Sequence, residues 1–308
     1  MASLKPMWLS VAPISERLRG AGSLLLGLDF DGTLTALEAD PRRTAVPART
    51  RDVVERLSRR SDVRLAVLSS RSLDDLWQRV GIAGVFYAGC SGLETRDRHG
   101  SVETHASPAA TMPPALLREL ESWCQRFPGA RLERQVNSCA LHFAEVAPSL
   151  QPAFGAGVRR RLHPHQPAVC LVHGRTSFEV RPAGGWDKAM ALERWLEPDA
   201  PPDALLFYFG DDTRDEPVHE TVRRRGGVAV AVGRLVSHAE FALPGPGEVT
   251  WFLEWLEREW TARIVLTPNV IHPGSPTEVT DASITAGPPW GSKVVLPTVQ
   301  PQTGWKLY

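Results

Sequence analysis

The stretch LLLGLDFDGTLT, residues 24–35, decides the fold of this chain. An apolar run of strand length leads directly into two aspartates, Asp29 and Asp31, and Gly32 follows at once. Taking carboxylates out of water costs free energy unless a cation or a hydrogen bond compensates them. Ligands of open parallel sheets bind beyond the carboxyl ends of the strands. The stretch therefore predicts a buried strand that presents two acids to a ligand.

The composition limits the class of protein. The chain has 308 residues, enough for one large domain or two smaller ones with their own cores. Its formal net charge is zero, so charge gives no argument for a nucleic-acid partner. The apolar runs are too short to cross a bilayer, and residues 1–20 lack the apolar core of a signal peptide. The four cysteines lack metal-type spacing, which favours free thiols in a reducing cytosol: Cys90, Cys124, Cys139 and Cys170.

Short apolar runs alternate with helix-type periodicity in the first part of the chain and again near its end. Ser72 is placed to cap one of the helices and Gly81 to end it. Strand, helix and strand in this order predict a parallel sheet with helices on its faces. The expected strands cover residues 24–28, 63–72, 84–89, 204–212 and 228–233, and the expected helices cover 50–61, 72–81, 188–196, 216–227 and 246–260.

The pattern changes between these two parts. The expected strands of this middle part alternate more clearly between apolar and polar residues, which favours an antiparallel sheet with one face in contact with water. We expect a second domain, residues 108–177, inserted into a first one made of residues 1–107 and 178–260. The expected elements are helices over 114–127 and 157–164, one or two strands over 131–146, and strands over 168–174 and 176–182.

Three of the expected strands end in polar residues suited to one task. The first gives Asp29 and Asp31, the second gives Ser69 to Arg71, and a later one gives Asp211 to Glu216, with Lys188 opening the helix before it. Acids gathered at one edge need a cation, and oxygen-only ligands suit Mg²⁺. A cation, a lysine and a hydroxyl together suit a phosphoryl group.

The spacing of the first two acids fits phosphoryl transfer. Asp29 can act as a nucleophile when Mg²⁺ and Lys188 screen the approaching phosphoryl oxygens. Asp31, two residues further on, projects to the same side of an extended chain, so it can protonate a leaving oxygen and then activate water. Gly32 lets the backbone approach a ligand closely.

The motifs resemble those of a known superfamily. DFDGTLT, VLSSR, Lys188 and GDDTRDE are similar, in order and spacing, to the four motifs of the haloacid dehalogenase (HAD) superfamily. Over about residues 24–256, AGCSGLETRDRHG, RLERQVNSCALHF and FEVRPAGGWDKAMAL resemble trehalose-6-phosphate phosphatases. The resemblance implies an α/β protein, with a HAD-type Rossmann-like parallel-sheet core and an inserted α+β cap domain.

The resemblance also implies roles for single residues. It makes Asp29 the nucleophile and Asp31 the acid/base, with Ser69 and Lys188 holding the phosphoryl group. The implied Mg²⁺ site comprises Asp29, the Asp31 carbonyl, Asp211, Asp212 and Asp215. The candidate substrate contacts are Gly32, Arg71, Gly92, Glu94, Glu133 and Glu179.

Four positions depart from the family pattern. Ser91 stands where the family usually has histidine, Gln135 where it has lysine, Ala144 where it has arginine and Arg214 where it has threonine. The residues of the hydrolytic chemistry are intact, so the departures bear on the substrate more than on the reaction.

The expected function is a cytoplasmic, Mg²⁺-dependent phosphatase that converts trehalose 6-phosphate to trehalose and phosphate through an aspartyl phosphate. The alternatives are a phosphatase for a glucosylglycerol, sucrose or glycosylglycerate phosphate, a phosphomutase, and a catalytically weak sugar-phosphate sensor. The expected partner is a small sugar phosphate, with a glycosyl-phosphate synthase as a candidate protein partner and no nucleic acid or membrane.

Residues 261–308 are rich in Pro, Thr, Gly and Ser and show no periodic apolar face. We expect a weakly ordered tail or one that wraps the body. Deleting roughly the last 45 residues should leave a folded, active phosphatase, because few core contacts are lost. Melting curves and phosphate release check this, and a large drop in melting temperature would mean that the tail packs as an integral part.

Overall fold

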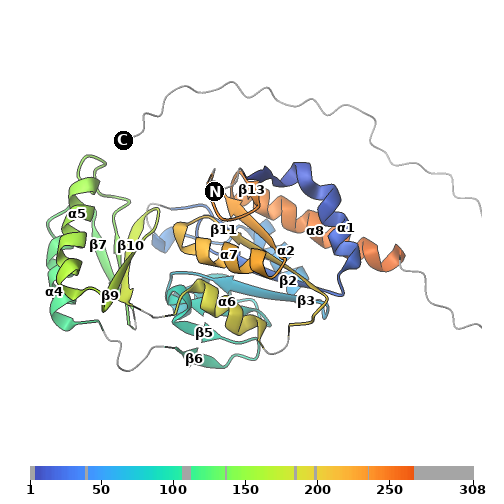
Figure 1. Ribbon diagram of the computed structural model, residues 1–308, viewed down its shortest axis with the longest axis horizontal. Helices are drawn as coiled ribbons and strands as arrows, with labels where there is room; N and C mark the ends of the chain where they lie inside the picture. The colour runs from blue at the N-terminus through green and yellow to red at the C-terminus, as the bar shows by residue number, and fades with distance from the viewer. Residues whose placement is uncertain are drawn as a thin grey trace, which may run out of the picture. The chain divides into compact units, whose positions relative to one another are not determined.

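The computed structural model describes residues 4–38, 41–105, 112–135, 137–183, 186–197, 200–234 and 236–266 (Figure 1). The expected tail lies outside the described residues from position 267 onward. Within the described part of the chain, no helix is both long and apolar enough to cross a membrane.

In the larger sheet, neighbouring strands run parallel to one another, except the last two strands in spatial order, which are antiparallel. The strand that ends in Asp29 lies near the centre of this sheet, so its backbone pairs with another strand on each edge. The order is β1 (Lys5–Pro6), β13 (Phe241–Leu243), β12 (Val228–Val232), β11 (Ala204–Gly210), β2 (Ser23–Asp29), β3 (Val63–Leu68), β4 (Phe86–Gly89), β5 (Glu94–Arg96) and β6 (Val102–Thr104).

Helices cover both faces of this sheet, because successive side chains of β2 point to opposite sides. Leu24, Leu26 and Leu28 join the core beneath one set of helices, whereas Leu25 joins the other. The first set is α1 (Val11–Gly20), α2 (Ala48–Ser58), α3 (Leu73–Val80) and α8 (Pro246–Leu266), and the second is α6 (Lys188–Leu196) and α7 (Glu216–Arg224).

A second, antiparallel sheet forms the inserted part, which we call the cap. Its order is β7 (Arg131–Arg134), β8 (Cys139–His142), β10 (Ser177–Pro182) and β9 (Val169–His173). The helices α4 (Pro114–Cys124) and α5 (Gln151–Leu162) pack with it around a separate apolar core. Figure 1 shows both helices on the side of the cap sheet away from the larger sheet. The other side of the cap sheet is therefore available to face the acids of the core.

The local chemistry of the expected elements explains their ends. Ser72 caps α3, since its Oγ accepts a hydrogen bond from the Asp75 N–H at 3.3 Å. Gly81 ends the same helix in the left-handed region, with φ 55°. The stretch predicted as one or two strands, 131–146, is the antiparallel pair β7–β8. Short 3₁₀ helices lie at η1 (Met7–Ser10), η2 (Pro41–Arg43), η3 (Cys90–Gly92), η4 (His163–His165) and η5 (Thr213–Asp215).

Some boundaries differ from expectation. β10 belongs to the cap sheet, so the cap extends beyond the expected end at residue 177. Helix α8 runs to Leu266, past the expected end of the core at residue 260. The strands β1, β5, β6 and β13 have two or three residues each, too few for a periodic pattern to indicate them. The division into core, cap and tail otherwise stays a prediction.

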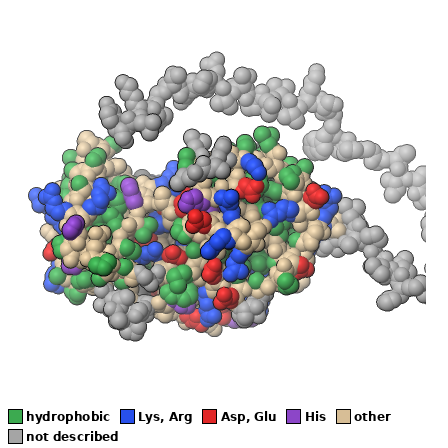
Figure 2. Space-filling view, viewed as in Figure 1, with side chains coloured by type: hydrophobic (Ala, Val, Ile, Leu, Met, Phe, Trp, Pro, Cys, Tyr) green, Lys and Arg blue, Asp and Glu red, His purple; other side chains and the backbone are tan. Residues whose placement is uncertain are grey.

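The surface charge fits the neutral sequence. On the face drawn in Figure 2, acidic and basic side chains are interspersed over the core, and basic ones gather at the end formed by the cap helices. The last turn of α5 carries three basic residues, Arg159 to Arg161.

Trp260 tests how much α8 contributes to the fold. Its side chain is fully buried and its Nε1 donates to Asp62 Oδ2 at 3.0 Å. We expect Trp260→Ala to lower the free energy of unfolding by about 3–5 kcal/mol, because it leaves a large cavity and an unpaired acceptor. Denaturant unfolding measures this.

Trp251 supplies the matched control, since it lies on the same helix and is 51% exposed. Trp251→Ala should cost less than about 1 kcal/mol. Equal losses for the two variants would contradict the packing described for α8.

Candidate active site

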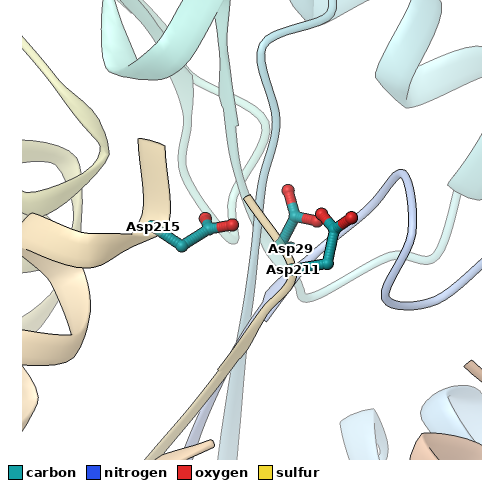
Figure 3. A group of neighbouring side chains, drawn as sticks. All are labelled: Asp29, Asp211 and Asp215. Carbon is teal, nitrogen blue, oxygen red and sulfur yellow. The ribbon is translucent and has the colours of Figure 1, made fainter. Parts of the chain in front are cut away.

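Three acids meet at the carboxyl edge of the larger sheet (Figure 3). Asp29 ends β2, Asp211 directly follows β11, and Asp215 lies in η5. One oxygen from each lies within 4.8 Å of the others, and all three residues are buried. The parallel pairing of β2 with β11 places the first two strand ends side by side, as the sequence predicted.

Lys188 is the cation of this cluster. Its Nζ donates to Asp29 Oδ1 at 2.6 Å and to Asp215 Oδ1 at 2.8 Å, while the residue is only 2% exposed. Lys188 is the first residue of α6, and Asp187 caps that helix by accepting the Met190 N–H. Burial alone would lower the pKa of Lys188, but Asp215 and Asp29 outweigh it and raise that pKa. Lys188 is therefore a permanent positive charge here.

Asp215 holds Lys188 rather than facing a ligand. Its Oδ1 also accepts from the Tyr208 hydroxyl at 2.7 Å, and its Oδ2 accepts from the Asp212 N–H at 2.9 Å. Both oxygens are thus occupied within the protein. Tyr208 comes from the interior of β11, where a buried tyrosine usually finds a partner for its hydroxyl.

Asp29 keeps one oxygen uncommitted. Among the described residues, its buried Oδ2 has no hydrogen-bond partner, and the residue lines a pocket between core and cap. Burial raises the pKa of Asp29 well above its ordinary value, and Asp215 and Asp211 add to this against Lys188. Burial, Asp215 and Asp212 likewise raise the pKa of Asp211 to about 7.

This excess of negative charge suits a divalent cation. Asp29 and Asp211 supply hard oxygen donors, the ligand type that such cations prefer. The unpartnered Asp29 Oδ2 is the kind of buried atom that a cation would satisfy. The residues present therefore fit a divalent metal ion at Asp29 and Asp211, with Asp215 behind them.

Asp31 lies beside the cluster in a different environment. Arg71 donates from Nε and Nη2 to its two oxygens, both at 2.7 Å, and also binds Asp75 at 2.8 Å. Burial would lower the pKa of Arg71, but Asp31 and Asp75 outweigh it and raise that pKa. The fork orients the Asp31 carboxylate next to the pocket, which both residues line.

The pocket continues from these acids onto the cap sheet. Gln135 closes one side by donating from Nε2 to the Ser70 carbonyl at 2.8 Å. Glu133 accepts from His142 at 2.9 Å, which is the main reason its pKa lies below the ordinary value. The cap residues that line the pocket are Glu133, Gln135, Ala140, His142, Arg175, Thr176 and Ser177. Carboxylate, amide, imidazole and hydroxyl groups suit a polyhydroxyl ligand.

Two glycines, Gly32 after β2 and Gly92 after β4, let neighbouring groups approach the backbone closely. Gly32 has φ +85°, and a Cβ there would lie 2.1 Å from Asp211 Oδ2. Gly92 has φ +102°, and a Cβ there would lie 2.5 Å from the Asp187 carbonyl oxygen. Gly92 thus lets η3 pack against the start of α6, which positions Lys188.

Other predicted site residues lie away from the pocket lining. Ser69 is buried and its Oγ accepts from the Arg71 N–H at 3.2 Å, so Ser70 rather than Ser69 lines the pocket. Glu94 Oε2 accepts from the Leu73 N–H at 3.4 Å, at the start of α3. Glu179 is 1% exposed and accepts from the Ser91 hydroxyl at 2.6 Å.

Asp212 faces the cap instead of the acid cluster. Its Oδ1 accepts from the Arg214 N–H and Nε at 3.0 and 3.1 Å, and its Oδ2 accepts from the Arg175 N–H at 2.8 Å. Burial would raise the pKa of Asp212, but Arg214 and the backbone donors hold it well below the ordinary value. Its expected support of the metal site is thus indirect, through the loop that carries Asp211.

Sequence reasoning missed Arg175 and Tyr208. Arg175 lies in the turn between β9 and β10 and donates from Nη1 to Asp211 Oδ2 at 3.0 Å. Nothing local in the sequence indicates that a cap turn reaches the core acids. Tyr208 could have been found, because it lies in an expected buried strand just before GDD and its hydroxyl needs a hydrogen-bond partner there.

Comparison with known proteins finds related sequences over most of the chain. A family model described as trehalose-phosphatase matches residues 27–243. The chain is 30% identical over 247 residues to a probable trehalose-phosphate phosphatase C of Arabidopsis thaliana, covering 76% of each chain. It is 31% identical over 242 residues to a trehalose-phosphate phosphatase of Mycobacterium tuberculosis, covering 75% of this chain and 60% of the relative.

Solved structures show the same fold. The C-terminal domain of the Candida albicans trehalose-6-phosphate phosphatase has a TM-score of 0.75 at 19% identity, covering 83% of this chain and 98% of that one. A trehalose-6-phosphate phosphatase related protein has a TM-score of 0.63 at 19% identity, covering 78% and 99%. These likenesses confirm the α/β core with an inserted cap.

Asp211 tests the electrostatics of the cluster. Its folded-state pKa of about 7 lies above the ordinary 3.8, so the folded state binds more protons than the unfolded one between these values. Ionisation of Asp211 therefore destabilises the fold increasingly as the pH rises from 3.8 to about 7. We expect Asp211→Asn to be more stable than the unmodified protein in chelator at about pH 8, with a smaller difference at about pH 5.

Denaturant unfolding at both pH values measures the difference. Adding a divalent cation should stabilise the unmodified protein and have little effect on Asp211→Asn. A variant that is less stable by the same amount at both pH values would contradict the charge excess.

Proposed function

Because the chain belongs to the trehalose-phosphatase family, we propose that this phosphatase hydrolyses trehalose 6-phosphate to trehalose and phosphate, with Mg²⁺ as its metal. The observation that carries the proposal is the Asp29 carboxylate, with one oxygen on Lys188 and the other unpartnered at the pocket. A nucleophile needs one fixed and one available oxygen, and a sensor has no need of such an acid.

In the proposed first step, the Asp29 carboxylate attacks the phosphorus of the sugar phosphate. The bond between phosphorus and the ester oxygen breaks, and an aspartyl phosphate forms on Asp29. Lys188 opposes the burial that raises the pKa of Asp29 and offsets the charge of the phosphoryl oxygens. Gly32, which has no side chain to intervene, leaves the approach to Asp29 and Asp211 open.

Asp31 would move the protons of both steps. It gives a proton to the leaving sugar oxygen, then takes one from the water that attacks phosphorus and releases phosphate from Asp29. Arg71 donates to both oxygens of Asp31, so Asp31 turns away from Arg71 to act as an acid. Arg71 then receives Asp31 again when the proton leaves, which sets the starting orientation for each turnover.

Asp29 and Asp211 would hold Mg²⁺, together with the Asp31 carbonyl that the family resemblance implies. When bound, this ion neutralises charge on the transferring phosphoryl group and favours the ionised form of the buried acids. The fit rests on the acid cluster and on the raised pKa values of Asp29 and Asp211. Ser69 supports the phosphoryl group only indirectly in this proposal, through the N–H of Arg71.

The cap would recognise the sugar. Glu133, His142 and Gln135 line the pocket opposite the acids and offer hydrogen bonds to hydroxyl groups. Gln135 carries no charge where the resembling family has lysine, which keeps another glycosyl phosphate as the second candidate substrate. Glu94 and Glu179, both committed to protein partners, contribute to the shape of the site rather than to direct contact.

Two further expectations stay proposals. The cysteines fit the expected cytoplasmic location, since none of the four described thiols forms a disulfide. An association with a glycosyl-phosphate synthase is also retained, on the ground that such an enzyme would supply this substrate.

Asp29→Asn tests the nucleophile. The amide keeps the shape of the side chain and removes the attacking oxygen, so phosphate release should fall by at least about 10³-fold. We expect folding to survive, because the amide oxygen can still accept from Lys188. The assay is phosphate release from trehalose 6-phosphate with Mg²⁺, alongside sucrose, glucosylglycerol and glycosylglycerate phosphates.

Asp74→Asn is the matched control, since Asp74 is exposed on α3 and outside the pocket. Near-normal release from Asp29→Asn would rule out the covalent mechanism. Faster release from another glycosyl phosphate in the panel would reassign the substrate and leave the mechanism in place.

A further inference from the structure

The turn between β9 and β10 is attached to the core through η5 and the residues before it. Asp212 Oδ2 accepts from the Arg175 N–H at 2.8 Å, and the Thr213 hydroxyl donates to the His173 carbonyl. Arg175 reaches back to Asp211 with its guanidinium. Three consecutive core residues, Asp211 to Thr213, thus bind the backbone and the Arg175 side chain of the cap turn.

Arg214 is the centre of this junction. Its side chain is 11% exposed, and its Nε and Nη2 donate to Asp212 at 3.1 and 3.3 Å. The guanidinium lies against Gly174, where a Cβ would lie 2.5 Å from Nη2 and 2.8 Å from Cζ. A core side chain therefore occupies the space that a side chain at position 174 of the cap would need.

The same guanidinium faces a buried acid of the cap sheet. Arg214 Nη1 lies 3.9 Å from Glu179 Oε2, which also accepts from Ser91. Among the described residues, Arg214 Nη1 and Glu179 Oε1 have no hydrogen-bond partner, although both are buried. A cation and an acid buried this deeply stabilise each other only while cap and core stay in this arrangement.

The opposite side of the pocket is joined less firmly. The hydrogen bond from Gln135 Nε2 to the Ser70 carbonyl connects β7–β8 to the core there. Gln135 also accepts from Ser138, so this contact holds the cap's own turn as well. Among the described contacts, several join cap and core around Arg214, whereas a single hydrogen bond joins them at Gln135.

We propose that Arg214 is a positioning residue, which fixes the cap over the acids and so sets the affinity for a substrate that the cap must contact. The inference rests on the proposed function, because it assigns sugar recognition to the cap. Arg214 itself lines the pocket. It also contacts Gly174 and Glu179, and between these two positions lie the pocket residues Arg175, Thr176 and Ser177. A small phosphate ester reaches Asp29 without the cap, so it depends less on Arg214.

The test compares trehalose 6-phosphate with 4-nitrophenyl phosphate in one enzyme preparation. We expect Arg214→Met to lower the ratio of kcat/KM for the sugar phosphate to kcat/KM for the small ester by about tenfold or more, the effect typical of a lost charge-assisted contact. The loss should appear mainly as a higher KM for the sugar phosphate. Arg214→Lys, which keeps the charge, should restore part of the ratio.

Gly174→Ala tests the same junction from the cap side. The added methyl group displaces the guanidinium without removing its charge, so the ratio should fall in the same direction. This variant and Arg214→Lys decide the question if Arg214→Met does not fold. Arg194→Met is the matched control, because Arg194 pairs with Glu103 outside the pocket. The ratio of the two kcat/KM values for this variant should equal that of the unmodified enzyme.

The outcomes separate this inference from the proposed function. An unmodified enzyme that releases phosphate from the small ester but not from trehalose 6-phosphate would overturn the substrate. If both substrates are hydrolysed and the Arg214 and Gly174 variants slow them equally, the positioning role is wrong and the substrate stands.

Discussion

The buried ammonium of Lys188, between Asp29 and Asp215, is the interaction on which the rest of the site depends. Three acids at one sheet edge repel one another, and removing them from water adds a further cost. Lys188 offsets part of the repulsion and part of the desolvation cost, while Tyr208 and the Asp212 N–H complete the hydrogen bonds of Asp215. What remains is an oxygen of Asp29 and the Asp211 carboxylate, whose Oδ2 accepts from Arg175, and a cation and a phosphoryl group can use these oxygens.

The site is built from two sheets, one in the core and one in the cap. The parallel sheet supplies acids at strand ends, where neighbouring strands bring distant residues together. The antiparallel cap sheet and its turn supply carboxylate, amide, imidazole and hydroxyl groups suited to a polyhydroxyl ligand, and the turn is attached to Asp212, just before η5. Chemistry and selectivity are thus carried by different elements, so changes at Gln135 or Ser91 alter the cap side and leave Asp29 and Lys188 as they are.

The sequence was most informative where one residue type decides the local structure. The apolar run before Asp29 predicted β2, and Ser72 and Gly81 predicted the ends of α3, because capping and burial act over a few residues. The gathering of Asp29, Asp211 and Lys188 followed from the parallel order of the strands. Contacts set by tertiary packing could not be predicted in this way. Arg175 on Asp211 and Arg214 on Gly174 join cap to core, and only the placement of the two sheets determines them.

The span of chain between Asp29 and Lys188 also governs how the protein forms. The two residues are 159 positions apart, and β11, which pairs with β2, follows later still. As the ribosome releases the chain, β2 and β3 are complete while the partner on the other edge of β2 does not yet exist. The nascent chain therefore carries an open apolar strand edge and an acid without its lysine until the cap has been synthesised, the condition in which premature association is favoured. Early folding of the cap, which has its own core, shortens the effective distance between these parts and favours correct closure of the sheet.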